Sequence, residues 1–173
     1  MPDSTLTQAI KEAYASAPSN VIIYHTIELW HPAFSAPIRV VRDYTDLTAT
    51  LEASAPRNAS TAVTFVAFNF EFTKPEVSST GLPEVTLTMD NVDRAIVANI
   101  EAALSTTDLV TVIYREFISS DLTAPQNNPP LSLIITSVVA DLYKVTAVAS
   151  FPNLMNKRFP TLEYSAETFV GLL

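Results

Sequence analysis

Two histidines, His25 and His31, are the side chains of this sequence best suited to acid–base or metal chemistry. They lie six residues apart in a segment that favours a strand, so they share a face at a separation of about 20 Å. That is too far to bind one metal ion from a straight strand, and Glu28 between them points to the opposite face. A metal ligand or general base would need further acidic partners, which the spacing does not supply. We therefore predict structural roles for both histidines.

Motifs for covalent, phosphate or dinucleotide chemistry are absent from the sequence. The chain has no cysteine, which excludes disulfides, thiolate zinc sites, iron–sulfur clusters and cysteine nucleophiles. Its two glycines, Gly81 and Gly171, cannot form a glycine-rich phosphate loop. No serine stands in a Gly-x-Ser-x-Gly or Ser-x-x-Lys context. We predict that the protein is not an enzyme and uses no cofactor and no metal; a hydrolase built on His25 or His31 is the weakest alternative.

Aromatic and basic side chains offer candidate contacts instead. Tyr24, Trp30 and Phe34 surround the turn segment HPAF, where they can form a sugar platform, an interface anchor or a corner of the core. The basic pair Lys157-Arg158 is either solvated or paired with an acidic group across a subunit interface. The same two alternatives hold for Arg39 and Arg42.

The composition predicts an assembled protein. Hydrophobic residues make up 48% of the 173 residues and charged residues only 16%, against about 25% charged in an average soluble domain. A monomer keeps its surface solvated with charge, so a chain this poor in charge is expected to cover part of its surface with copies of itself or with a partner.

The net charge of −8, with 10 basic against 18 acidic residues, argues against specific nucleic-acid binding. A channel with an acidic lining would still let DNA slide through without sticking. No apolar run is long enough to cross a bilayer, and the N-terminus lacks the features of a signal peptide. We expect no membrane segment and folding in the cytoplasm.

Hydrophobic periodicity predicts six to eight strands and two short helices, hence an α+β fold dominated by antiparallel β-sheet, arranged as a sandwich or a barrel. In the strand expected over 61–73, alternation places Val66, Phe68, Phe70 and Phe72 in the core. The expected helices are 4–16 and 92–104, and the expected strands are 21–30, 38–44, 61–73, 84–90, 108–118, 131–139 and 143–151. The strand over 108–118 should be covered on both faces. Residues 46–53 are undecided between helix and strand, and 119–130 form a long polar loop.

After Phe151 both periodicities end, although the remaining residues are too apolar for a free tail. We predict a β-rich domain over 1–151 and an extended assembly segment over 152–173, which wraps the domain or docks on another subunit. Loop 119–130 is a second candidate interface. The candidate subunit-interface residues of the segment are Leu154, Met155, Lys157, Arg158, Phe159, Leu162, Tyr164, Phe169 and Leu172.

Several blocks of the sequence resemble an uncharacterised family of tailed-phage minor tail proteins encoded near the tape measure gene. They are QAIKEAYASAPSNVIIYHTIELWHPAFSAPIRVVRDYTDLTATLE, TFVAFNFEFTKPEV, GLPEVTLTMDNVDR and MNKRFPTLEYSAETFVGL, and together they cover almost the whole chain. The order of elements is more distantly similar to the lambda-type minor tail protein of the tail-tip hub. That relative carries a cysteine-bound iron–sulfur cluster in its C-terminal region. This chain has no cysteine, so its own C-terminal segment would have to be fixed by apolar contacts.

The resemblance implies a hub-like fold and a structural role in the virion. The expected protein forms a ring at the phage tail tip, or baseplate hub, between the tail tube or distal tail ring and the central tip protein, with the tape measure protein nearby. The resemblance favours a trimer, with a hexamer as the alternative, around an acidic lumen for DNA. The alternative function is a host-surface glycan-binding tail module that uses Tyr24, Trp30 and Phe34.

Overall fold

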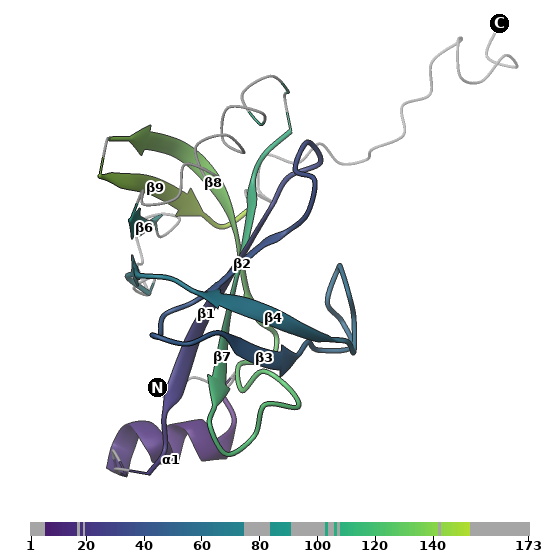
Figure 1. Cartoon of the computed structure of the whole chain (residues 1–173), viewed down its shortest axis with the longest axis vertical. Helices are drawn as coiled ribbons and strands as arrows, with labels where there is room; N and C mark the ends of the chain where they lie inside the picture. Colours follow the sequence, from purple (N-terminus) through teal and green to yellow (C-terminus); the bar gives the residue numbers. More distant parts are fainter. Residues whose placement is uncertain are drawn as a thin grey trace, which may run out of the picture.

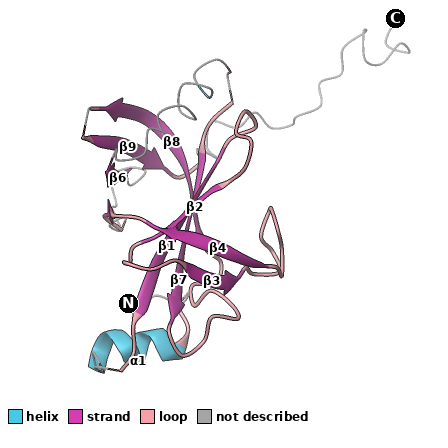
Figure 2. Ribbon diagram, in the orientation of Figure 1, coloured by secondary structure: helices cyan, strands magenta, loops and turns pink. Residues whose placement is uncertain are grey.

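The computed structural model describes residues 6–16, 18, 20–74, 84–90, 103, 106, 108–141 and 143–152. This part of the chain forms a nine-stranded sheet with one short helix next to the ends of its central strands (Figures 1 and 2). The strands are in the order β3-β4-β2-β1-β7-β8-β9-β6-β5. The elements are α1 (Gln8–Ser16), β1 (Ile23–Trp30), β2 (Ile38–Val41), β3 (Leu47–Thr50), β4 (Ala62–Ala67), β5 (Phe70–Phe72), β6 (Glu84–Asp90), β7 (Thr111–Ile118), β8 (Leu131–Ala140) and β9 (Lys144–Ser150).

The predicted mainly antiparallel β architecture is confirmed, and the barrel alternative is wrong. All strand pairs are antiparallel except β2 with β4. Only Phe68 and Asn69 separate β4 from β5, although these strands lie near opposite ends of the sheet order. A link this short brings the two ends of the sheet close together. The sheet stays open because no ladder joins the short end strands β3 and β5 within the described residues.

Strands β1 and β7 form the centre of the sheet and carry a hydrophobic core on each face. The larger core lies against β6, β8 and β9, and it includes Ile27, Leu29, Val112 and Tyr114. The smaller core lies on the other face, where β3 and β4 cross β1 and β7 (Figure 1). Phe117 belongs to it and contacts Phe65, with the ring centroids 5.9 Å apart. The prediction that 108–118 is covered on both sides is therefore confirmed.

The predicted single strand over 61–73 is wrong, because Phe68 and Asn69 interrupt it and divide it into β4 and β5. In β4 the inward residues are Val63 and Phe65, and Phe65 is fully buried in the smaller core. Val66, predicted in the core, is 54% exposed. Beyond the break, Phe70 is buried in the larger core and Phe68 and Phe72 pack against it, as predicted. The two halves face different cores, and so the continuous alternation fails.

Other sequence predictions hold where the structure describes them. The alternation of Val85, Leu87 and Met89 toward the core is confirmed, as are the first helix and the β8–β9 hairpin. The undecided residues 46–53 contain strand β3. The helix predicted over 92–104 lies outside the described residues except for Ala103, and the segment 152–173 except for Pro152. No helix within the described residues is long and apolar enough to cross a membrane.

Candidate functional site

Charged side chains occupy the centre of the sheet on both faces. Strands β1 and β7 pair along their whole length, with Thr26 opposite Arg115 and His25 opposite Glu116. Side chains alternate along a strand, so Arg115 points to one face and Glu116 to the other. Both are buried, with 0% and 1% exposure. Each therefore needs polar partners, because an unpaired buried charge is strongly destabilising.

The first group of partners, here named the arginine cluster, consists of Glu28, Arg39, Glu52, Arg57 and Arg115. Arg115 donates two hydrogen bonds to the Glu52 carboxylate, at 2.8 and 2.9 Å, and a third to Glu28 Oε2 at 3.2 Å. Glu28 also accepts hydrogen bonds from Arg39 Nε at 3.1 Å and Arg57 Nε at 3.2 Å. Every charged group thus has a partner of opposite sign, which is the condition for burying charge.

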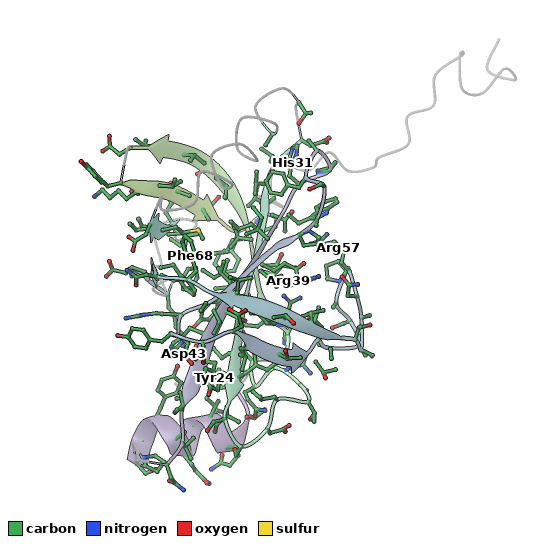
Figure 3. The ribbon with its side chains drawn as sticks, viewed as in Figure 1. Tyr24, His31, Arg39, Asp43, Arg57 and Phe68 are labelled. Carbon is green, nitrogen blue, oxygen red and sulfur yellow. The ribbon has the colours of Figure 1, made fainter. Side chains whose placement is uncertain are left out.

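The loop after β3 holds the outer part of this cluster (Figure 3). The Arg57 guanidinium lies 4.2 Å from the centre of the Trp30 ring, a cation–π contact. Asn58 has a positive φ of 52° and accepts a hydrogen bond of 2.8 Å from Arg39 Nη2. Asparagine tolerates this left-handed conformation better than most residues do. The arginine cluster therefore fixes the loop to the sheet.

The second group, here named the Glu116 cluster, consists of Tyr14, His25, Lys74, Tyr114 and Glu116. Glu116 Oε1 accepts hydrogen bonds from Tyr114 Oη at 2.5 Å and Tyr14 Oη at 3.2 Å, and Lys74 Nζ pairs with the same oxygen. Tyr114 donates its one proton to Glu116, so the hydroxyl oxygen accepts from His25 Nδ1 at 2.6 Å. Within the described residues Glu116 Oε2 is buried and has no hydrogen-bond partner.

Burial and the Glu116 charge set the protonation of this cluster. Burial, reinforced by the nearby carboxylate, raises the pKa of both Tyr114 and Tyr14 above the ordinary value of 10.0. Burial lowers the pKa of His25 below 6.5, and Glu116 offsets this only in part. Burial alone would lower the pKa of Lys74, but its contact with Glu116 raises it. At neutral pH the two tyrosines and the imidazole are therefore neutral, and Lys74 is an ammonium beside Glu116.

A cavity of about 430 Å³ adjoins this cluster. Most of its wall is apolar, and Glu116 and Asn127 are polar groups beside it. Asn127 comes from the loop 119–130 and is anchored by its amide, which accepts from Glu116 N at 3.0 Å and donates to Tyr114 O at 3.1 Å. Chemically, this cavity suits an apolar segment that carries a hydrogen-bond donor or a cation. Its lining residues are Leu6, Lys74, Tyr114, Glu116, Asn127, Pro129, Pro130, Leu131, Ser132 and Phe151.

The structure separates the two histidines, as predicted. His25 lies in the Glu116 cluster, whereas His31 is fully buried beyond the end of β1. His31 Nδ1 accepts from Ala33 N at 3.0 Å, and its Nε2 lies 3.1 Å from the carbonyl oxygen of Asp108. Both ring nitrogens of His31 thus have structural partners. Within the described residues no three histidine or acidic side chains come close enough to hold a metal ion.

The three predicted aromatic contacts are not brought together. Tyr24 packs beside the smaller core, Trp30 lies at the opposite end of β1 against Arg57, and Phe34 is buried in the larger core beside His31. Figure 3 shows the separation of Tyr24 from His31 along this strand. Whether any of them contacts a ligand stays a prediction.

The basic residues have mixed outcomes. Arg39, expected to be solvated or paired across an interface, instead binds Glu28 within its own chain, whereas Arg42 is exposed. The predicted interface residues of 152–173 lie outside the described part of the chain. They are Leu154, Met155, Lys157, Arg158, Phe159, Leu162, Tyr164, Phe169 and Leu172.

Sequence reasoning missed both buried clusters. The available signal was charge inside apolar strands: Glu28 in the first strand and the adjacent Arg115 and Glu116 in the central one. Charged residues are almost never fully buried unless they are paired. A central strand covered on both faces should therefore have prompted a search for their partners.

Comparison with known proteins gives a family but no activity. The model of one family, described as Domain of unknown function (DUF1833), matches residues 9–164. No match was found among curated proteins.

Proposed function

The chain belongs to the DUF1833 family of domains of unknown function, and from its sequence resemblance and its surface we propose that it is a structural, non-enzymatic minor tail protein of a tailed bacteriophage. In this proposal it forms a ring at the tail tip, between the tail tube or distal tail ring and the central tip protein. A trimer is favoured over a hexamer. The sequence blocks that resemble phage tail proteins support the location in the virion.

The observation that carries the proposal is made on the described residues: arginines are withdrawn from the surface, while tyrosines are exposed on it. Arg39, Arg57 and Arg115 are drawn into the arginine cluster and contribute little to the surface. Tyr44 is 100% exposed and Tyr143 is 80% exposed. Tyrosine is enriched at protein interfaces, where its ring is buried and its hydroxyl finds a partner. Both features favour a chain whose surface is covered in an assembly.

The acidic lumen is supported by the sign of the exposed charges. Within the described residues the exposed cations are Arg42, Lys74 and Lys144, and Lys74 already pairs with Glu116. A ring that turns such a surface inward would repel the phosphate backbone. The exposed carboxylates are those of Glu12, Asp46, Glu71, Glu84, Asp108, Asp121 and Asp141.

A mass measurement tests the proposal. We expect the purified full-length protein, alone or mixed with neighbouring tail proteins, to give a closed oligomer by light scattering and native mass spectrometry. Polar substitutions in the assembly segment, Phe159→Ser with Leu162→Ser, should return it to the monomer while its circular dichroism stays unchanged. A protein that remains monomeric with every tail neighbour, or that is missing from purified virions, would refute the ring.

The glycan-binding alternative is weaker. Arg57 occupies one face of the Trp30 ring, and Phe34 is buried, so neither offers an open aromatic platform. A change in Trp30 fluorescence on adding host polysaccharide would reverse this order.

A further inference from the structure

We propose that the cavity beside Glu116 is the docking site for the basic pair Lys157-Arg158 of a neighbouring copy. This inference rests on the proposed ring, and it gives the assembly segment a specific receptor on the next subunit. The partner is a second copy of this chain, and the group recognised is a side-chain cation flanked by apolar residues.

The first step is the unused oxygen of Glu116. Its Oε1 is shared by Tyr14, Lys74 and Tyr114, whereas its Oε2 has no partner within the described residues. A buried carboxylate oxygen without a donor is costly, and such groups are rare in native proteins. Lys74, which pairs with Oε1, is half-exposed and lines the same cavity, so in this proposal the incoming cation competes with Lys74 for the carboxylate. The single subunit therefore leaves a hydrogen-bonding position to be filled.

The second step is the character of the cavity wall. Leu6, Pro129, Leu131 and Phe151 supply apolar surface around Glu116 and the Lys74 ammonium that pairs with it. A matching occupant is a segment with apolar side chains on both sides of a cationic one. A carboxylate binds a guanidinium or ammonium more strongly than it binds a neutral donor.

The third step is the match to the assembly segment. Its sequence LMNKRFP places Lys157-Arg158 between Leu154-Met155 and Phe159-Pro160. These are the basic pair and the flanking apolar residues that the cavity calls for. Phe151 lines the cavity, so the segment of each subunit starts at the wall of its own cavity, and Lys157 lies within about 20 Å of that point along the chain.

Docking in the next subunit gives a head-to-tail contact. Such heterologous contacts generate a ring when the rotation between subunits closes. The same contact therefore explains both the unfilled oxygen of Glu116 and the apolar, non-periodic C-terminus.

Engineered disulfides test the site, because the chain has no cysteine of its own. Ser132→Cys is placed on the cavity wall, at an exposed residue. Lys157→Cys is placed on the segment of a second full-length preparation, and the two are mixed and oxidised. The control replaces Ser132→Cys with Thr64→Cys, an exposed position on β4 outside the cavity. We expect a disulfide-linked dimer between the two preparations, at least tenfold more abundant than with the control.

A second arm tests the charge. Arg158→Glu added to the Lys157→Cys preparation should lower the yield of linked dimer at least tenfold, while Arg158→Lys should keep it. Equal yields from Ser132→Cys and Thr64→Cys would overturn the site. So would a variant carrying both Ser132→Cys and Lys157→Cys that forms the link only within one chain. If native mass spectrometry gives a ring while the link is missing, the docking site is wrong and the ring stands. If no ring forms with any tail neighbour, the proposed function has failed.

Discussion

Glu28 on β1 and Arg115 on β7 lie diagonally across the strand pair on one face of the sheet, with Oε2 and Nη1 3.2 Å apart and both side chains fully buried. The pair is joined by Glu52, which binds Arg115 through both of its oxygens. Replacing Arg115 would leave the largely buried Glu52 carboxylate without this partner, whereas Glu28 would keep Arg39 and Arg57.

We predict that Arg115→Met lowers the free energy of unfolding by about 3–5 kcal/mol, since breaking a buried ion pair leaves an uncompensated charge. The measurement is urea unfolding at neutral pH. Arg42→Met is the matched control, because Arg42 is exposed and a surface substitution changes stability by about 0.5 kcal/mol or less. A loss below 1 kcal/mol for Arg115→Met would mean that the arginine cluster does not carry the stability assigned to it.

Neighbouring residues of β4 test the corrected face assignment. Phe65→Ala removes a fully buried ring from the smaller core, so we expect a loss of about 3–5 kcal/mol. Val66→Ala changes a side chain that is 54% exposed, and it should cost about 0.5 kcal/mol or less. Thermal or urea unfolding of the two variants settles the order. A larger loss of stability for Val66→Ala than for Phe65→Ala would instead support the continuous strand predicted from alternation.

This strand also shows how far the sequence predicts the fold. The β8–β9 hairpin and β6 follow local periodicity, and β7 is a run that is apolar on both faces; each of these strands was correctly predicted. The break at Phe68-Asn69 has no glycine or proline to mark it. It exists because β4 pairs with β2 and β5 pairs with β6, and such long-range pairing leaves no local signal.

The candidate site was less predictable for a related reason. A charge inside an apolar strand indicates that a partner exists, but it does not identify the partner. Arg115 binds Glu52, which is 63 residues away in the sequence, and Glu116 binds Tyr14, which is 102 residues away. Only the folded sheet brings these residues together, so their spacing in the sequence carries no information.

His25 should make stability depend on pH. Burial lowers the pKa of His25 below its ordinary value of 6.5. Between the folded and the unfolded pKa, the unfolded chain therefore binds a proton that the folded chain does not. The stability contributed by the neutral, buried imidazole is lost as the pH falls from about 6.5 through the folded pKa. We expect His25→Asn, which can still donate near Tyr114, to unfold with a weaker pH dependence between pH 7 and pH 5 than the natural chain. Parallel stability curves over this window would show that His25 is not the group responsible.

Next to Glu116 the side chain of Asn127 binds the backbone of β7, where β8 no longer pairs with it. Its amide pairs with the backbone N–H of Glu116 and the backbone carbonyl of Tyr114, and Gln126 N donates to the Glu116 carbonyl at 2.7 Å. This part of the loop 119–130 is thus bound to β7. Asn127→Ala leaves two buried backbone groups without partners, at about 1–3 kcal/mol for each.

The specific readout for Asn127→Ala is hydrogen exchange at the Glu116 amide. We expect this amide to exchange at least tenfold faster in the variant, because its acceptor is gone, while the amides of β9 keep their protection. Asn128→Ala, at an exposed neighbouring position, should leave the Glu116 amide protected. If both variants exchange alike, the side chain of Asn127 does not hold the loop, and the cavity wall beside Glu116 must be stabilised by the prolines and Leu131 alone.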